Sequence, residues 1–203
     1  MISLDEIILN GKETALAVID IVNDFCCDGF RYNELGWDFK SMKEMVDRRL
    51  LKFVRRSKGN TMLVFIKSFY DPNQFANDKN AVTNLCVEGT KGAEFYGLNP
   101  RDADFVFIKH VWSALIGKDS KPTQLHYWFQ ERGINTLVEL GVTLTHCISH
   151  NIEDALKLGY RVVLPRDCVA SRGELFDAHR KIISKYESSP NVMVVDSGQI
   201  KYT

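Results

Sequence analysis

Residues 134–165 read INTLVELGVTLTHCISHNIEDALKLGYRVVLP. The apolar run at 134–142 and the run at 160–165 have the length and composition of buried strands. Between them, residues 147–159 carry apolar side chains at helical spacing and end at Gly159, a residue that favours helix C-termini. Strand, helix and strand in this order build parallel sheets, so this segment predicts an α/β fold.

The same alternation continues on both sides of this segment. Further strands are predicted at 14–22, 61–69, 104–109 and 191–197, and further helices at 38–57, 122–133 and 173–188. Strands that are apolar throughout indicate a sheet covered by helices on both faces. We therefore predict one domain over residues 1–203, a three-layer α/β/α doubly wound sandwich with a mainly parallel sheet of about six strands.

Composition excludes several classes of partner. The 26 Lys and Arg residues are balanced by 26 Asp and Glu residues, so we expect no nucleic-acid partner. There is no apolar stretch of bilayer length and no secretory signal pattern, which predicts no membrane contact and a cytoplasmic location. The five cysteines lack paired spacing, which argues against a disulfide framework or structural zinc site. No glycine-rich phosphate motif occurs, so no nucleotide cofactor is expected.

Three polar residues lie at or beyond the carboxyl ends of predicted strands. Asp20 ends the run ALAVI, Lys109 ends DFVFI, and Cys147 lies a few residues beyond LVELGV, in the first turn of the next helix. Ligands of open parallel sheets bind at this edge, so the three side chains are expected to converge. The long irregular stretch 70–104 is typical of a lid or binding loop, and we expect it to shape substrate selectivity.

This trio suits nucleophilic chemistry. A thiol is a weak nucleophile at neutral pH until a cation, a base or a helix N-terminus favours its thiolate. Lys109 would supply the cation, Asp20 the base, and the helix beginning near His146 the dipole. A lone cysteine after a strand is by default a buried core thiol, but the joint placement of all three residues favours a reactive Cys147.

Three segments resemble motifs of the isochorismatase-like cysteine hydrolases, the family that includes nicotinamidases and N-carbamoylsarcosine amidases. They read ALAVIDIVNDF (15–25), FIKHVWSAL (107–115) and GVTLTHCISHNIEDALKLGYRVVLPRDCVAS (141–171). The resemblance runs in order from about residue 14 to 196. It implies a cofactor-independent hydrolase that cleaves a C–N bond in a small amide, ureido or carbamoyl compound through a thioester acyl-enzyme. It also implies a homo-oligomer, a dimer or tetramer.

Carried over position by position, the resemblance implies a role for each member of the trio. Asp20 is the expected proton shuttle, Lys109 orients and charges the site, and Cys147 is the covalent nucleophile. A cis peptide bond is implied between Val142 and Thr143. It would direct the Thr143 amide, together with that of Cys147, into an oxyanion hole.

The resemblance also suggests the pocket wall. Phe25 and Trp112 match positions where relatives line the substrate pocket with aromatic surface. His146 and His150 flank the cysteine at helical spacing, but no HExxH motif accompanies them. We expect His146 to line the substrate pocket rather than bind a metal.

The sequence departs from the nicotinamidase branch where that branch holds a metal. The expected Asp-x-His pair is replaced by KSFYDP (67–72), and the second ligand segment reads NLCVEGT (84–90). We therefore expect no metal, although a role of His146, His150 or Asp71 in an unusual metal site stays open. Val22 and Asn151 are further departures from the family pattern, at positions where glutamine and threonine are frequent.

Two other classes of function remain open at this point. One is a catalytically silent binding or interaction protein: the intact trio argues against it, whereas Val22, Asn151 and the lost metal ligands keep it open. The other is a redox-reactive thiol protein, which would be favoured if Cys147 formed a stable sulfenate or a disulfide with Cys26 or Cys27.

Overall fold

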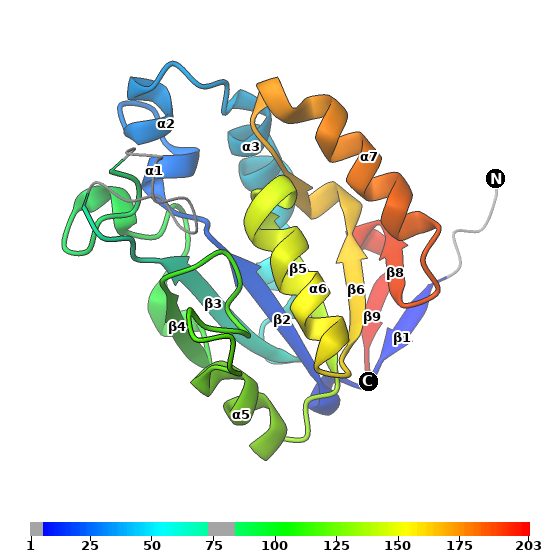
Figure 1. Cartoon of the computed structure of the whole chain (residues 1–203). Coiled ribbons are helices and arrows are strands. Elements are labelled where there is room, and N and C mark those ends of the chain that lie inside the picture. The colour runs from blue at the N-terminus through cyan, green and yellow to red at the C-terminus, as the bar shows by residue number, and fades with distance from the viewer. Residues whose placement is uncertain (1–5, 73–83) are drawn as a thin grey trace, which may run out of the picture.

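The computed structural model describes residues 6–72 and 84–203. Among these residues the main sheet has seven strands, and all of its pairings are parallel (Figure 1). They are β2 (Thr14–Ile19), β3 (Met62–Ser68), β4 (Phe105–Lys109), β5 (Thr136–Val142), β6 (Arg161–Pro165), β7 (Val169–Ala170) and β8 (Val192–Val195). The order is β4-β3-β2-β5-β6-β8, and β7 pairs with the end of β5. The direction of winding therefore reverses between β2 and β5, where open α/β sheets bind their ligands.

The main sheet agrees with the expected count of about six strands, because six strands form its continuous order and the two-residue β7 adds one pairing. Besides β7, a separate two-stranded parallel sheet joins β1 (Ile7–Leu9) to β9 (Ile200–Tyr202) near the two ends of the described chain (Figure 1). Each missed strand has only two or three residues. So short a run shows no periodicity of its own, and only its partner defines it as a strand.

Helices cover both faces of the main sheet. They are α1 (Asn23–Cys26), α2 (Arg31–Glu34), α3 (Lys40–Met45), α4 (Leu51–Ser57), α5 (Gln124–Glu131), α6 (Ser149–Lys157) and α7 (Phe176–Glu187). A π-helical turn, Val46–Leu50, joins α3 to α4, and another, Leu144–Ile148, precedes α6. Short 3-10 turns span Gly11–Glu13, Lys91–Ala93, Pro100–Asp102, Arg166–Cys168, Gly173–Leu175 and Ser197–Gln199.

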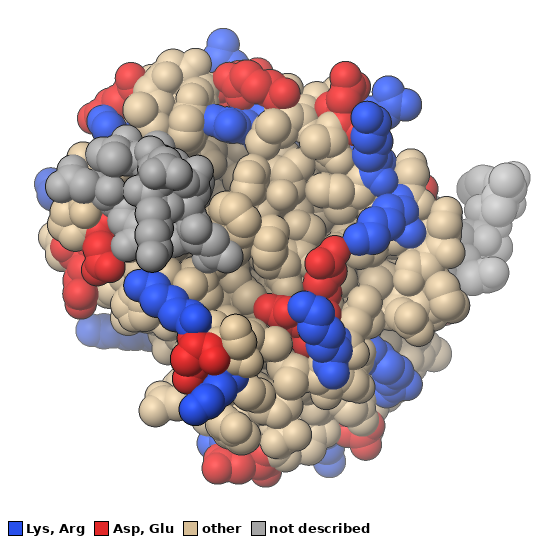
Figure 2. Space-filling model, viewed as in Figure 1, with Lys and Arg blue, Asp and Glu red and all other residues tan. Residues whose placement is uncertain are grey.

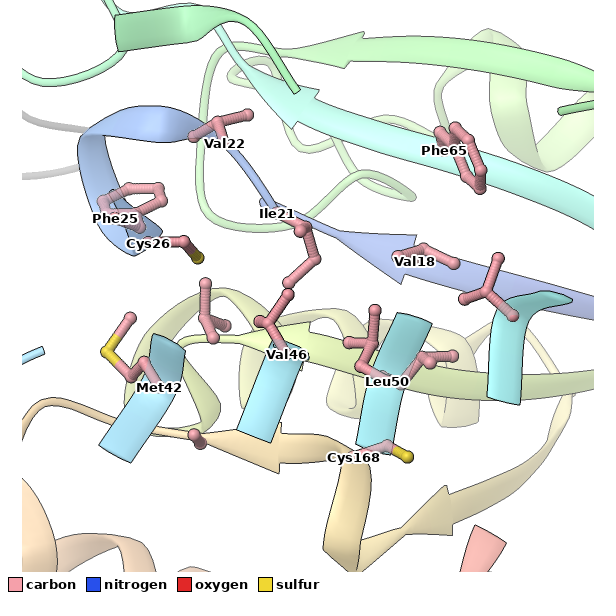
Figure 3. Packing of buried hydrophobic residues seen from close by; sticks show 14 of the residues in the cluster. Val18, Ile21, Val22, Phe25, Cys26, Met42, Val46, Leu50, Phe65 and Cys168 are labelled. Atoms are coloured by element: carbon pink, nitrogen blue, oxygen red, sulfur yellow. The ribbon is translucent and has the colours of Figure 1, made fainter. Parts of the chain in front are cut away.

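The core consists of two apolar clusters separated by the sheet. On one face the side chains of α1 to α4 pack against alternate residues of β2, and Figure 3 shows Val46 and Leu50 turned toward Ile21 and Val18. On the other face α5, α6 and α7 pack against the intervening residues of β2, such as Ala17. This is the predicted three-layer sandwich, because strands buried on both faces need cover on both.

Surface charge agrees with the balanced composition. Figure 2 shows basic and acidic side chains scattered among uncharged ones over the coloured part of this face. In the residues that the structure describes, no helix has the length and apolar character needed to cross a membrane.

The ends of β2 and β5 approach each other closely at one glycine. Gly141 pairs with Ile19 in the ladder and has a φ of +129°. A Cβ at this position would lie 2.0 Å from the carbonyl oxygen of Ile19. Only glycine fits at position 141. Its lack of a side chain lets the ends of β2 and β5 approach each other at the switch point, where the strand order reverses.

Gly141→Ala is expected to lower the free energy of unfolding by about 2–3 kcal/mol, because it adds a backbone clash to an unfavourable φ. Urea unfolding would measure this loss. Gly133→Ala is the matched control, since Gly133 also has a positive φ but a Cβ added there would meet no atom within 4 Å. Equal losses in the two variants would contradict the clash.

Candidate active site

Asp20 is held in an unusual conformation directly after β2. Its φ of +56° lies in the left-handed region that few residues other than glycine adopt. The backbone N–H of Asp20 donates to the carbonyl of Ile66 at 2.8 Å, and its carbonyl accepts from the N–H of Val22 at 2.9 Å. These bonds fix the turn, and the carboxylate is fully buried.

Lys109, the last residue of β4, pairs with this carboxylate. Its Nζ lies 2.8 Å from Asp20 Oδ2, and both side chains are almost completely buried. The ammonium also donates to the carbonyl of Val111 at 3.2 Å. Burial by itself lowers the pKa of Lys109, but the neighbouring Asp20 and Cys147 outweigh it and raise the pKa above its ordinary value. These two neighbours thus favour the charged form of Lys109.

Cys147 lies in the π-helical turn Leu144–Ile148, so the helix begins three residues before the predicted start at Cys147. Its Sγ is 3.4 Å from Lys109 Nζ. Burial raises the pKa of Cys147 to about 12; Lys109 lowers this pKa, and Asp20 raises it. Desolvation therefore outweighs the effect of the Lys109 cation on this pKa. A thiol whose pKa is raised in this way needs a base at the moment of attack.

The three predicted residues therefore form one hydrogen-bonded cluster at the switch point. Asp20 comes from the end of β2, Lys109 from the end of β4, and Cys147 from the turn after β5. A buried acid, a fixed cation and a thiol in contact are the groups that covalent acyl transfer needs.

Two hydroxyl groups that the sequence analysis did not select complete this cluster. Ser68, the last residue of β3, has its Oγ 2.9 Å from Asp20 Oδ1 and 2.6 Å from Lys109 Nζ. The hydroxyl of Tyr70 lies 2.9 Å from Ser68 Oγ and 4.0 Å from Cys147 Sγ. The strand-end argument that selected Asp20 also applies to Ser68. From the sequence, the KSFYDP segment (67–72) indicated only that the expected Asp-x-His metal ligands are absent.

The segment between β5 and Cys147 has the backbone that the resemblance implies. The peptide bond between Val142 and Thr143 is cis. The carbonyl of Thr143 accepts from the N–H groups of His146 and Ile148, at 3.2 and 3.1 Å. Thr143 itself is buried, at the foot of the turn that carries Cys147.

The expected pocket residues belong to two separate aromatic groups. Trp112 packs against His146 and His150, with ring centroids 5.2 and 4.6 Å apart. Phe25 is buried behind Tyr32, at 4.8 Å between ring centroids. Burial, helped by the charge of Arg172 and by His150, lowers the pKa of His146 to about 4.

Arg172 is a further residue that sequence reasoning missed. Its guanidinium carbon lies 4.0 Å from the ring centroid of Trp37, and its charge acts on both His146 and Tyr32. Burial raises the pKa of Tyr32, and Cys147 also contributes to this rise. Arg172 thus places a positive charge close enough to His146 and Tyr32 to affect both. Arg172 lies one residue beyond the third motif segment (141–171), and no pattern in the sequence indicates a role for it.

The described residues around Asp20 and Cys147 do not suit a divalent metal. Ser68 and Tyr70 occupy the end of β3 with hydroxyls that bind Lys109, at 2.6 and 3.5 Å. His150 Nδ1 is 2.8 Å from the carbonyl of His146, and Asp71 is exposed, 3.8 Å from Lys118. Within residues 6–72 and 84–203, no three His, Cys, Asp or Glu side chains gather as a metal would require.

Comparison with known proteins identifies the family. The family model described as the isochorismatase domain matches residues 14–195. The chain belongs to the isochorismatase family. N-carbamoylsarcosine amidase of Arthrobacter sp is 33% identical over 176 residues, covering 80% of this chain and 61% of that protein. The nicotinamidase/pyrazinamidase of Mycobacterium tuberculosis is 27% identical over 155 residues, covering 71% and 80%.

Solved structures of the isochorismatase family share the fold. The crystal structure of PnC1 from L. infantum in complex with nicotinate has a TM-score of 0.79 at 19% identity, covering 97% of this chain and 99% of that one. The family and the α/β fold class predicted from the sequence are both confirmed. The part of the 70–104 stretch at 73–83 lies outside the described residues, so its expected part in selectivity stays a prediction.

Proposed function

We propose that this isochorismatase-family protein hydrolyses the C–N bond of a small amide, ureido or carbamoyl compound, with Cys147 as the nucleophile. The contact that carries this proposal is the buried cluster in which Lys109 Nζ lies 2.8 Å from Asp20 and 3.4 Å from Cys147. The names of the amidase relatives support the reaction class.

The proposed chemistry has two stages. Asp20 takes the thiol proton as the sulfur attacks the substrate carbonyl, and the backbone amides of Thr143 and Cys147 stabilise the oxyanion. Asp20 then returns the proton to the leaving nitrogen, which departs as ammonia or an amine and leaves a thioester. In the second stage Asp20 activates water, which releases the acid product and the free thiol. Lys109 keeps its charge throughout and orients Asp20.

We further propose that the substrate carries a carboxylate some distance from its amide. Arg172 supports this, because a guanidinium stacked on an aromatic ring presents its N–H edge for bidentate binding of a carboxylate. The aromatic rings of Trp112 and His146 would flank the uncharged part of the substrate.

The test is ammonia release from paired substrates, N-carbamoyl amino acids and monoamides of dicarboxylic acids against their methyl esters. Wild type is expected to prefer the free acids. Cys147→Ala should lower the rate by at least about 10³-fold. Arg172→Gln should raise KM for the acids about tenfold, leave kcat nearly unchanged, and leave the esters unaffected.

The controls separate the two parts of the proposal. Cys168→Ala removes another buried thiol and Arg180→Gln another arginine near an aromatic ring, and both should behave as wild type. Retained activity in Cys147→Ala would refute the nucleophile. An unchanged KM in Arg172→Gln would refute only the carboxylate site.

The redox alternative has less support. All five cysteines are free thiols, and burial raises the pKa of Cys26 far above its ordinary value. Such a thiol exchanges slowly, because the thiolate is the reacting form.

A further inference from the structure

We propose that the hydroxyls of Ser68 and Tyr70 form a reversible hydrogen-bond relay between Asp20 and Cys147, and that Tyr70 donates to the sulfur once Asp20 holds the thiol proton. This inference rests on the proposed role of Cys147 as nucleophile. It adds two residues to the reactive cluster and assigns them the task of stabilising the thiolate.

The relay is a continuous chain of buried contacts. Ser68 Oγ lies 2.9 Å from Asp20 Oδ1 on one side and 2.9 Å from the hydroxyl of Tyr70 on the other. The Tyr70 hydroxyl in turn lies 4.0 Å from Cys147 Sγ. Ser68 is fully buried and Tyr70 is 4% exposed, so bulk water does not compete for these bonds.

The number of available protons allows the hydrogen bonds of the relay to point in either direction. An ammonium can only donate hydrogen bonds, and the contact between Lys109 Nζ and Ser68 Oγ is 2.6 Å long. Ser68 therefore accepts from Lys109 and keeps one proton of its own to donate. Asp20 and Tyr70 are equally near, but one proton serves only one of them.

Which direction prevails depends on where the charge lies. In the resting state Asp20 is the strongest acceptor, so Tyr70 donates to Ser68 and Ser68 donates to Asp20. When the S–H bond breaks and an O–H bond forms on Asp20, the negative charge moves to Cys147. The Ser68 hydroxyl then donates to the Tyr70 oxygen, and the Tyr70 hydroxyl donates to the sulfur of Cys147. Each hydroxyl keeps its own proton, and the net charge of the cluster is unchanged.

The surrounding structure holds Tyr70 in the orientation that this task requires. Its backbone N–H donates to the carbonyl of Cys86 at 3.1 Å, and the N–H of Cys86 donates to Asp24 Oδ2 at 2.6 Å. Burial raises the pKa of Tyr70 well above its ordinary value, so the phenol keeps its proton and can act as a donor. The 4.0 Å contact with a neutral thiol is expected to shorten when the sulfur is charged.

The experiment measures how fast iodoacetamide alkylates Cys147 between about pH 6 and about pH 9, because only the thiolate reacts. Peptide mass spectrometry reads the rate at Cys147 separately from the other cysteines. Tyr70→Phe keeps the ring and removes only the hydroxyl. It is expected to slow alkylation about tenfold at each pH, the effect of losing one hydrogen bond to a charged group. Ser68→Ala should act similarly, and the double variant should be no slower than the slower single variant.

Matched controls remove buried hydroxyls outside the cluster. Tyr160→Phe deletes a hydroxyl that bonds His126, and Ser57→Ala one that bonds Tyr202. Both should alkylate at the wild-type rate. Thermal melting of every variant separates a loss of hydrogen bonding from a loss of folding.

Two results would overturn the relay. One of them leaves the proposed nucleophile standing, and the other overturns it as well. If Tyr70→Phe and Ser68→Ala react like wild type while Lys109→Met reacts more slowly, the relay fails and the proposed nucleophile stands. If Cys147 reacts like an ordinary thiol and neither Asp20→Asn nor Lys109→Met changes its rate, the relay and the proposed function fail together.

Discussion

Lys109→Met is expected to lower the free energy of unfolding by about 3–5 kcal/mol, because it leaves the buried carboxylate of Asp20 without its cation. Asp20→Asn should cost a similar amount by isolating the ammonium. The double variant should be more stable than either single variant, since neither charge is then left alone in the core. Urea unfolding of the four proteins at neutral pH gives this cycle directly.

An exposed ion pair provides the control for this cycle. Lys58 and Asp102 are 2.7 Å apart, but their side chains are 55% and 41% exposed. Lys58→Met should therefore change stability by less than about 1 kcal/mol, because water screens and solvates the remaining charge. If Lys109→Met is no more costly than Lys58→Met, the buried pair does not hold the ends of β2 and β4 together.

Glu139→Gln is expected to stabilise the protein strongly at alkaline pH. Glu139 is fully buried in the middle of β5, and no partner in the described structure meets hydrogen-bond geometry with its carboxyl oxygens. Burial raises the pKa of Glu139 from 4.5 to about 8; the nearby Asn151 amide lowers it and Asp154 raises it. The carboxyl is therefore protonated in the folded protein at neutral pH, whereas in the unfolded chain it is ionised.

The sign of the pH effect follows from this difference. Between about pH 4.5 and about pH 8 the folded state binds more protons than the unfolded state, so stability falls as pH rises. The loss approaches 3–5 kcal/mol, an order-of-magnitude figure from about 1.4 kcal/mol per pKa unit. Glutamine has nearly the same shape and never ionises.

Urea unfolding at about pH 5 and about pH 9 tests this prediction, with the exposed Glu88→Gln as control. The gain from Glu139→Gln should be small at the lower pH and large at the higher one, and Glu88→Gln should show no such difference. A gain that is the same at both values would mean that Glu139 does not titrate in this range.

The buried acid also lies beneath the helix that follows Cys147. Asn151 of α6 accepts from the N–H of Ala114 at 2.8 Å, which ties α6 to the segment carrying Trp112. Asn151 thus lies between Glu139, in the core of the sheet, and the segment that forms one wall of the site. No pattern in the sequence predicts that Glu139 lies beneath α6, because this residue belongs to an otherwise apolar strand.

The sequence by itself determined the fold class and three residues of the candidate site. Apolar runs of strand length alternating with amphipathic helices permit few arrangements other than a covered parallel sheet. Once the strands are parallel, their carboxyl ends share one edge, so Asp20, Lys109 and the region of Cys147 had to approach one another.

Only the tertiary structure decided the chemistry at that edge. Whether Cys147 rests as a thiol depends on how completely it is desolvated, which is a property of packing. The Tyr70 hydroxyl reaches the sulfur, and Arg172 packs on Trp37, from irregular segments that follow no periodic rule. Local pattern determines which elements form, whereas distances between residues far apart in the chain, and the dielectric around them, arise only when those elements pack.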